Sequence, residues 1–217
     1  MSTDRKLAFY HSPQTRSSGV FLLLEELGAT YDLRLVNMKA GDQRKPEYLA
    51  INPMGKVPAI RHRGELITEQ GEIFIYLADA FPEKGLAPAL DDPLRGPYLR
   101  WLVYYGSSFE PAVIDKAMKR DAAPASTSPY GDYDTMLATL VGQLRNGPWL
   151  LGERFTAADI LWGTALQWTT SFKLVPELPE IMGYIARVAA RPAVATINAR
   201  DAELAARHVA AAAQGKD

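Results

Sequence analysis

The segment Asn52-Pro-Met-Gly-Lys-Val-Pro58 contains the residues whose types and spacing most clearly predict binding chemistry. Its Val57-Pro58 pair closes a glycine-containing turn before the apolar Ala59-Ile60, so the proline stands at a strand entrance, where it donates no ladder hydrogen bond. If the Val57–Pro58 bond is cis, the N–H and C=O of Val57 are free to pair with an extended peptide ligand. The alternative is a trans proline on an ordinary edge strand.

The composition excludes several other kinds of site. The 217 residues contain no cysteine, which rules out disulfides, thiolate metal sites and any mechanism in which the protein supplies a sulfur nucleophile. The three histidines, His11, His62 and His208, show no ligand spacing, so we expect no metal site. We expect His62 and His208 to be solvated surface residues, and His11, just after the first strand, is a minor candidate for lining a site.

The charge balance and hydropathy indicate a soluble protein without nucleic-acid or membrane partners. The formal net charge is −1, from 24 basic and 25 acidic residues, which gives no electrostatic attraction to nucleic acid or to an anionic membrane. No segment approaches the roughly 18 uninterrupted apolar residues of a membrane helix, and residues 1–6 show no signal-peptide pattern. We therefore expect a cytoplasmic protein.

The first part of the chain predicts a small mixed sheet with helices. Apolar residues at helical spacing indicate a helix over 17–27, closed by Gly28 in a left-handed conformation, between two short strands. A hairpin and a further helix follow. The expected elements are strands 6–10 and 31–36 around the first helix, strands 57–61 and 65–68, and helix 70–80.

The remainder predicts an all-helical domain. A stretch rich in proline and glycine indicates a linker. The predicted boundaries are 1–83 for the first domain, 84–92 for the linker and 93–217 for the helical domain. Prolines separate the expected helices, which are 94–119, 130–146, 157–172, 178–190 and 193–209.

One helix start shows a capping pattern whose role is folding rather than chemistry. Thr156 at the N-cap and Asp159 at the third helical position can each satisfy a backbone N–H, while Phe155 and Ile160 occupy the positions of a hydrophobic staple. If this helix start is buried, we expect loss of the cap to cost about 1–2 kcal/mol.

These segments together carry a family resemblance. The matching segments are Leu7-Ala-Phe-Tyr10, Ser12-Pro-Gln-Thr-Arg-Ser-Ser18, the helix Val20 to Leu27, the Val57-Pro58 turn, Thr68-Glu-Gln70 and Leu150-Leu-Gly-Glu-Arg-Phe-Thr-Ala-Ala-Asp-Ile160. In order and spacing they resemble the cytosolic glutathione transferases, in particular a cysteine-free bacterial member of the beta or a related class. The resemblance spans most of the chain. It implies an α/β N-terminal thioredoxin-like domain followed by an all-α C-terminal helical bundle.

The resemblance also implies a glutathione site. It assigns the cysteinyl backbone of glutathione to Val57 and Pro58, beside Lys56, and the γ-glutamyl end to Glu69 and Gln70. A helix N-terminus offers unpaired N–H groups to the γ-glutamyl carboxylate, and Glu69 offers a counter-charge to the ammonium group. The family usually has serine after the acidic residue, so Gln70 is a departure. The alternative is that Glu69 and Gln70 only cap a helix.

Activation of the glutathione thiol requires little energy. Lowering a thiol pKa from about 8.5 to near 7 takes about 2 kcal/mol. One charge-assisted hydrogen bond supplies about 1.5–3 kcal/mol, so one hydroxyl at the start of the first helix suffices. By the resemblance, the cysteine of bacterial members falls on Arg16 and the following serine on Ser17. We rank Ser17 and Arg16 first and Thr15 next, and a hydroxyl that does not face the thiol is expected to cap the helix.

The second substrate is expected to be a small hydrophobic electrophile. Four aromatic residues crowd the helix that would face it in this family, and Tyr105 and Trp101 are the predicted contacts, although aromatic residues at this spacing also suit a core. The resemblance implies a homodimeric glutathione transferase that stabilises the thiolate and conjugates it to, or uses it to reduce, the electrophile.

Two other functions remain open. One is a glutathione-binding or protein-interaction module of the same fold without transferase activity, which Arg16 and Gln70 favour. The other is a glutathione-dependent isomerase or ether-cleaving lyase, although the serine-and-cysteine loop of the isomerase branch is missing. A reductase that uses its own cysteine is excluded by composition.

Overall fold

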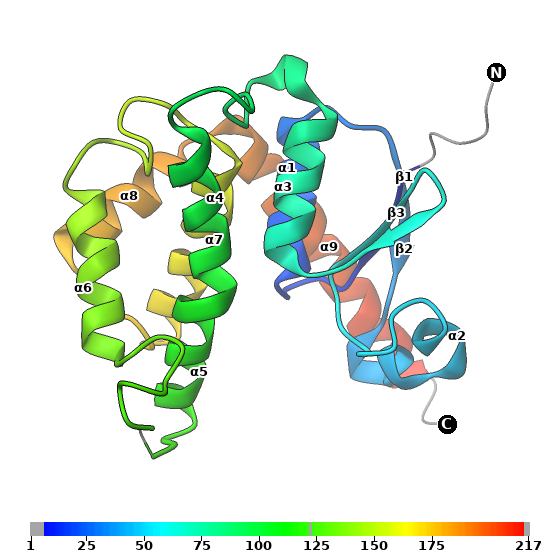
Figure 1. The fold of residues 1–217 in the computed structure, drawn as a ribbon. Coiled ribbons are helices and arrows are strands. Elements are labelled where there is room, and N and C mark those ends of the chain that lie inside the picture. Colours follow the sequence, from blue (N-terminus) through cyan, green and yellow to red (C-terminus); the bar gives the residue numbers. More distant parts are fainter. Residues whose placement is uncertain (1–6, 122, 215–217) are drawn as a thin grey trace. The chain divides into compact units, whose positions relative to one another are not determined.

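A computed structural model describes residues 7–121 and 123–214, and the chain forms two compact units (Figure 1). The first unit combines Met1–Ile73 with Pro192–Asp217, and the second is Phe74–Arg191. The predicted linker, residues 84–92, lies inside the second unit. The C-terminal helix α9, Pro192–Gln214, groups with the first unit.

The first unit is built on a four-stranded mixed sheet in the order β2-β1-β3-β4. β1 pairs in parallel with β2 and antiparallel with β3, and β3 pairs antiparallel with β4. Lys6, which the predicted first strand included, lies outside the described residues. The elements are β1 Leu7–His11, α1 Ser17–Glu26, β2 Tyr31–Leu35, the 3-10 turns Met38–Ala40 and Asp42–Arg44, α2 Pro46–Leu49, β3 Ala59–His62, β4 Glu65–Ile67, and α3 Gln70–Ala80, which continues into the second unit.

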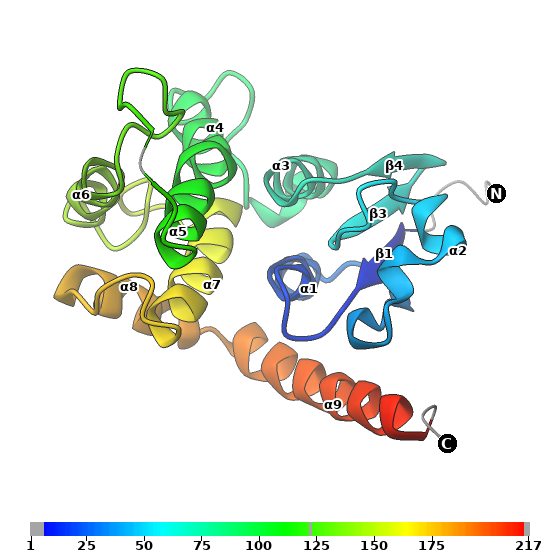
Figure 2. The same cartoon turned by 90° about the horizontal axis from the view of Figure 1, so that it is seen from below.

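Side chains of β1 divide between the two faces of the sheet, as a pleated strand requires. Leu7, Phe9 and His11 are buried on the face that α1 covers, where the rings of Phe9 and His11 contact Phe21. α9 packs along α1, while α2 lies on the opposite side of the sheet (Figure 2). Gly28 has φ 58°, which confirms the predicted left-handed end of the first helix.

The prediction that His62 is a solvated surface residue is wrong. Its exposed fraction is 7%, because it follows Ile60 on the inward face of β3, while Arg61 between them is exposed. His208 on α9 is partly buried.

The second unit is helical, as predicted. Its helices are α4 Arg95–Tyr104, a π-helical turn Tyr105–Phe109, α5 Glu110–Ala117, α6 Tyr133–Leu144, α7 Ala157–Ser171 and α8 Pro179–Ala189, after a 3-10 turn Pro82–Lys84. The predicted continuous helix 94–119 therefore contains a π-turn. Pro111 follows this turn in the first positions of α5, where its missing N–H interrupts the regular hydrogen-bond ladder.

The predicted cap of α7 is confirmed. The Asp159 carboxylate accepts hydrogen bonds from the N–H of Thr156 at 2.8 Å and from the N–H of Leu150 at 2.8 Å, and the Tyr184 hydroxyl donates to it at 2.8 Å. Asp159 has no exposed surface. Burial raises the pKa of its carboxyl, although these hydrogen bonds oppose the shift.

Candidate functional site

The Val57–Pro58 turn has the geometry expected of a peptide-binding edge. The peptide bond between the two residues is cis. β1 and β3 pair as far as Tyr10 and Ala59, so the same register places Val57 opposite Ser12, just beyond the last pair. Within the described parts of the chain, neither the N–H nor the C=O of Val57 takes part in a turn or loop hydrogen bond. Its backbone hydrogen-bonding groups are therefore not used within the turn, as pairing with an extended ligand requires, while the residue itself is 8% exposed and packs with Val36 and Tyr48.

Two hydrogen bonds fix the carbonyl of Lys56, the residue before this pair. The Tyr48 hydroxyl and the Asn52 side-chain amide both donate to the carbonyl oxygen of Lys56, at 2.6 and 2.9 Å. Burial raises the pKa of Tyr48 to about 12, so its hydroxyl remains a donor near neutral pH. Lys56 itself is exposed. The turn is thus anchored without using the backbone groups of Val57.

The start of α3 is tied to the loop before α1. Gln70 donates from Nε2 to the carbonyl oxygen of Arg16 at 2.9 Å, and its Oε1 is buried without a hydrogen-bond partner among the described residues. Glu69 is exposed and has φ 59°, a left-handed conformation unusual outside glycine. The structure therefore brings the predicted 15–17 and 69–70 segments together, and it shows a structural role for the glutamine that replaces the usual serine.

Ser17, a first-ranked candidate for thiol activation, is completely buried. Its Oγ lies 2.8 Å from His11 Nδ1 and 2.7 Å from Thr15 Oγ1, and it is within hydrogen-bond distance of both the N–H and the C=O of Ser12, at 3.1 and 2.9 Å. A hydroxyl enclosed by these groups has no surface left for a bound sulfur. Its position fits an internal role.

The other two candidates in the loop are accessible. Thr15 is partly buried, and its hydroxyl lies 2.7 Å from the carbonyl oxygen of Ser12 and accepts from the N–H of Ser17 at 3.2 Å. Arg16 is exposed and stands at the N-cap of α1, where its side chain makes no capping bond. Of Thr15 and Ser17, only Thr15 has exposed surface.

Sequence reasoning missed Asp201 on α9, which contacts Gln14 of the loop across 187 positions of the sequence. Its Oδ2 accepts from the N–H of Gln14 at 2.8 Å and from the Ser18 hydroxyl at 3.1 Å. Its Oδ1 lies 2.9 Å from His11 Nε2. Burial acts to raise the pKa of Asp201, but the contacts with His11, Gln14 and Ser18 lower it overall.

Ser17, His11 and Asp201 thus form a connected serine–imidazole–carboxylate arrangement. In hydrolases such a series activates the serine for attack on a substrate. Here Ser17 and His11 are both without exposed surface, so no substrate can reach the oxygen. The arrangement can orient the loop but cannot act as a hydrolytic triad.

The predicted acceptor contacts lie in the aromatic core of the second unit. Trp101 has an exposed fraction of 1% and Tyr105 one of 2%. Their rings contact Trp162, whose Nε1 donates to the carbonyl oxygen of Trp101 at 2.9 Å. Packing accounts for these contacts, and a role in binding the second substrate stays a prediction.

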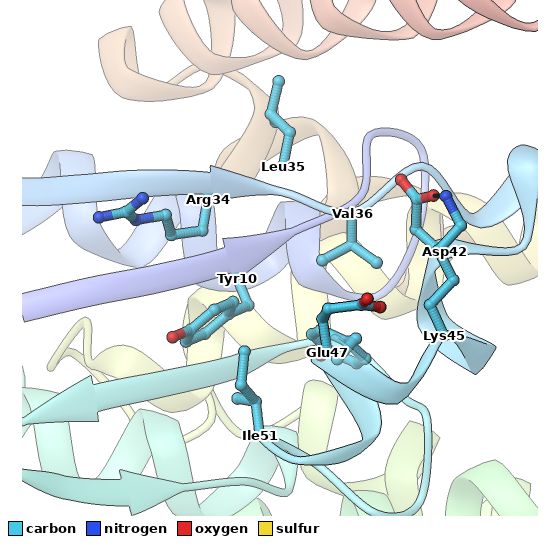
Figure 3. A pocket seen from close by; sticks show the side chains of 9 residues that line it. Tyr10, Arg34, Leu35, Val36, Asp42, Lys45, Glu47 and Ile51 are labelled. Carbon is cyan, nitrogen blue, oxygen red and sulfur yellow. Dashed lines mark ion pairs between the residues drawn. The ribbon is translucent and has the colours of Figure 1, made fainter.

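A separate hollow of about 450 Å³ lies on the α2 side of the sheet. Tyr10, Val36 and Ile51 project toward one another in it, and the ion pair of Asp42 with Lys45 stands at its edge (Figure 3). None of the predicted glutathione contacts lines this hollow.

The described residues contain neither a metal-binding cluster nor a membrane-spanning helix. Among 7–121 and 123–214, no cluster of three or more acidic or histidine side chains could hold a metal ion. No helix in the same ranges combines the length and apolar character needed to cross a bilayer.

Comparison with known proteins identifies the family. The family model for the glutathione S-transferase N-terminal domain matches residues 15–80, and the one for the C-terminal domain matches residues 129–192. A glutathione S-transferase of Escherichia coli O157:H7 is 30% identical over 193 residues, covering 87% of this chain and 95% of its own. A disulfide-bond oxidoreductase of Escherichia coli K12 is 30% identical over 198 residues, covering 85% of this chain and 90% of its own.

Solved structures give the same result. A glutathione transferase from Methylococcus capsulatus has a TM-score of 0.76 and 29% identity, covering 90% of this chain and 98% of its own. A sphingomonad glutathione S-transferase complexed with glutathione has a TM-score of 0.74 and 28% identity, with the same coverage of 90% and 98%. The first unit is thioredoxin-like and has a cis Val57–Pro58 bond, and the second is helical and has the buried cap of α7. Together with these matches, they show that the chain belongs to the glutathione S-transferase family.

Proposed function

We propose that this protein is a glutathione transferase that binds reduced glutathione in its first unit, stabilises the thiolate and directs it at a small hydrophobic electrophile. One observation carries the proposal. Two connections join the parts of the site. The pairing of β1 with β3 places Val57, whose backbone makes no turn or loop hydrogen bond, next to the loop that contains Thr15, Arg16 and Ser17. The hydrogen bond from Gln70 to Arg16 joins the start of α3 to the same loop. Structures of relatives contain glutathione, including a sphingomonad transferase.

In the proposed complex, the cysteinyl backbone of glutathione pairs with Val57 beside Pro58 and Lys56. The exposed carboxylate of Glu69 pairs with the ammonium group of the γ-glutamyl end. Gln70 has one amide hydrogen in use on the loop, so it contributes mainly by fixing the position of α3 relative to that loop.

Thr15 is the proposed hydroxyl partner of the sulfur, because Ser17 has no exposed surface while Thr15 is only partly buried. A charge-assisted bond contributes about 1.5–3 kcal/mol, against about 0.5–1.5 kcal/mol for a neutral one. The thiolate therefore competes successfully with the Ser12 carbonyl for the Thr15 hydrogen. Arg16, exposed at the helix start, adds positive charge. The sulfur then attacks the electrophilic carbon, a C–S bond forms, and the leaving group departs with the electron pair of its bond.

The test is the ultraviolet thiolate absorbance of bound glutathione across pH, together with turnover of a chloronitrobenzene. Thr15→Val should lower kcat about ten- to hundredfold, since losing 1.5–3 kcal/mol corresponds to about that factor. Thr139→Val is the matched control, because Thr139 is likewise a partly buried threonine whose hydroxyl donates to a backbone carbonyl, that of Thr135, but it lies on α6 of the second unit. No glutathione binding at millimolar concentration would overturn the proposal, and binding without a thiolate near neutral pH would favour the non-catalytic binding module.

The proposal also includes a homodimer acting in the cytoplasm, as is typical of the family. Light scattering coupled to size-exclusion chromatography measures the mass of the particle in solution. A mass equal to one chain of 23.9 kDa at micromolar concentration would contradict the dimer.

A further inference from the structure

The loop that presents Thr15 contains a strained residue. Gln14 has φ 57°, in the left-handed region that is unfavourable for a residue with a side chain. Such a conformation persists only where the surroundings hold it. Its N–H donates to Asp201 Oδ2 at 2.8 Å, so the carboxylate of α9 is positioned to hold it.

The same carboxylate is connected to Thr15 by two further routes. On the C-terminal side of Thr15, the Ser18 hydroxyl donates to Asp201 Oδ2 at 3.1 Å. From inside the unit, Asp201 Oδ1 contacts the ring of His11, whose other nitrogen contacts Ser17, and Ser17 Oγ lies 2.7 Å from Thr15 Oγ1. Asp201 therefore constrains Gln14 before Thr15, Ser18 after it and, through His11, the Ser17 hydroxyl that contacts it.

The His11 contact also sets the direction of the hydrogen bonds. A carboxylate only accepts, so the ring hydrogen belongs on Nε2, which faces Asp201. In the neutral ring, Nδ1 then accepts the hydrogen of Ser17. Ser17 has a single hydroxyl hydrogen, so this arrangement leaves Thr15 as the hydroxyl whose hydrogen can turn to the sulfur.

We propose that Asp201, acting through His11, Gln14 and Ser18, is a positioning residue for thiol activation, so that the C-terminal helix controls the reactivity of the bound thiol. This inference rests on the proposed function. Asp201 does not touch glutathione in this scheme. Its removal should change the state of the bound sulfur much more than the affinity for glutathione.

The test compares Asp201→Ala, Asp201→Asn and Arg200→Gln. Arg200 is the matched control because it is the neighbouring residue on α9, and its ion pair with Glu25 of α1 joins the same two helices without touching the loop. In each folded variant, the thiolate absorbance of saturating glutathione is titrated against pH, and kcat and KM for glutathione are measured separately.

We expect Asp201→Ala to raise the apparent pKa of the bound thiol by about one unit and to lower kcat about tenfold, with KM changed less than threefold. Asp201→Asn keeps an acceptor for Gln14 and Ser18 but loses the charge facing His11, so its effect should be intermediate. Arg200→Gln should match the wild type. If Asp201→Ala does not fold, Asp201→Asn tests the inference instead, and we expect it to lower kcat about threefold.

A purely structural role for Asp201 would lower the melting temperature but leave the thiol titration and kcat unchanged. An Asp201 variant that titrates like Arg200→Gln overturns the inference, even when the wild type forms a thiolate and the proposed function stands. Absence of a thiolate in the wild type itself instead overturns the proposed function.

Discussion

Asp159 offers a stability prediction whose magnitude follows from its contacts. Replacing it with alanine leaves the N–H groups of Leu150 and Thr156 buried without an acceptor, and both are fixed in the backbone and cannot turn away. Each unpaired buried donor costs about 1–3 kcal/mol, so the two together cost about 2–6 kcal/mol. The hydroxyl of Tyr184 can rotate and adds less. We expect Asp159→Ala to lower the free energy of unfolding by about 4 kcal/mol.

Asparagine at this position should cost about half as much. Its carbonyl oxygen can accept from one of the two backbone N–H groups, while its amide group faces the other and leaves it unpaired. The matched control is Asp132→Ala, since Asp132 caps α6 by accepting from the N–H of Thr135 at 2.7 Å in an exposed position. An exposed cap contributes about 1 kcal/mol. The expected order of cost is therefore Asp159→Ala, then Asp159→Asn, then Asp132→Ala.

Urea unfolding followed by tryptophan fluorescence measures this order directly. All four tryptophans, Trp101, Trp149, Trp162 and Trp168, lie in the second unit with Asp159, so the signal reports on that unit. A domain with a typical stability of about 5–15 kcal/mol would retain a measurable transition in the asparagine variant. Equal midpoint shifts for Asp159→Ala and Asp132→Ala would refute the reasoning, because they would show that the buried donors find other acceptors or water.

Three further predictions follow from single contacts. The pKa of Asp201 is lowered in the folded protein, so the ionised carboxylate stabilises the fold above the ordinary aspartate pKa of about 4, and this stabilisation is lost as the pH falls below that value. Asp201→Asn should therefore flatten the acid side of a plot of melting temperature against pH. Gly163→Ala should lower the free energy of unfolding by about 1–3 kcal/mol, because its Cβ would lie 2.6 Å from both γ-carbons of Val188. Gly142→Ala, on the open face of α6, should raise it by about 0.5–1 kcal/mol in the same urea assay. Gln70→Ala should weaken glutathione binding in calorimetry by releasing the 15–17 loop, and unchanged affinity would show that this hydrogen bond is dispensable.

The sequence predicted the local elements because their signals are local. Gly28, which ends α1, and the Thr156 and Asp159 pair, which caps α7, each depend on residues only a few positions away, and the structure confirms both. The same holds for the strand–helix–strand and hairpin–helix order of the first unit. The π-helical turn at Tyr105–Phe109 was not predicted, because the apolar pattern that indicates a helix barely changes when one residue is inserted into a turn.

The candidate site was predicted less completely, because its supporting contacts are distant in the chain. Val57 and Pro58 could be found from a turn pattern. No local pattern connects Asp201 to Gln14, since the two are brought together only when α9 packs on α1. The burial of Ser17 likewise depends on the side chain of His11, and alternation along β1 places that side chain on the covered face of the sheet.

The absence of cysteine limits what a thiolate formed here can do. With no protein sulfur available, a mixed disulfide between glutathione and this chain cannot form, so disulfide exchange would have to run entirely between glutathione molecules. Conjugation has no such requirement, because one thiolate displaces one leaving group and the electrons balance within that step. Reduction of a peroxide would need a second glutathione to accept the oxidised sulfur of the first. Exposed Arg16, where the resemblance places the cysteine of bacterial members, can attract that anion but cannot exchange sulfur with it. The loop can therefore contribute charge to conjugation or to reduction by glutathione, but it contributes sulfur to neither.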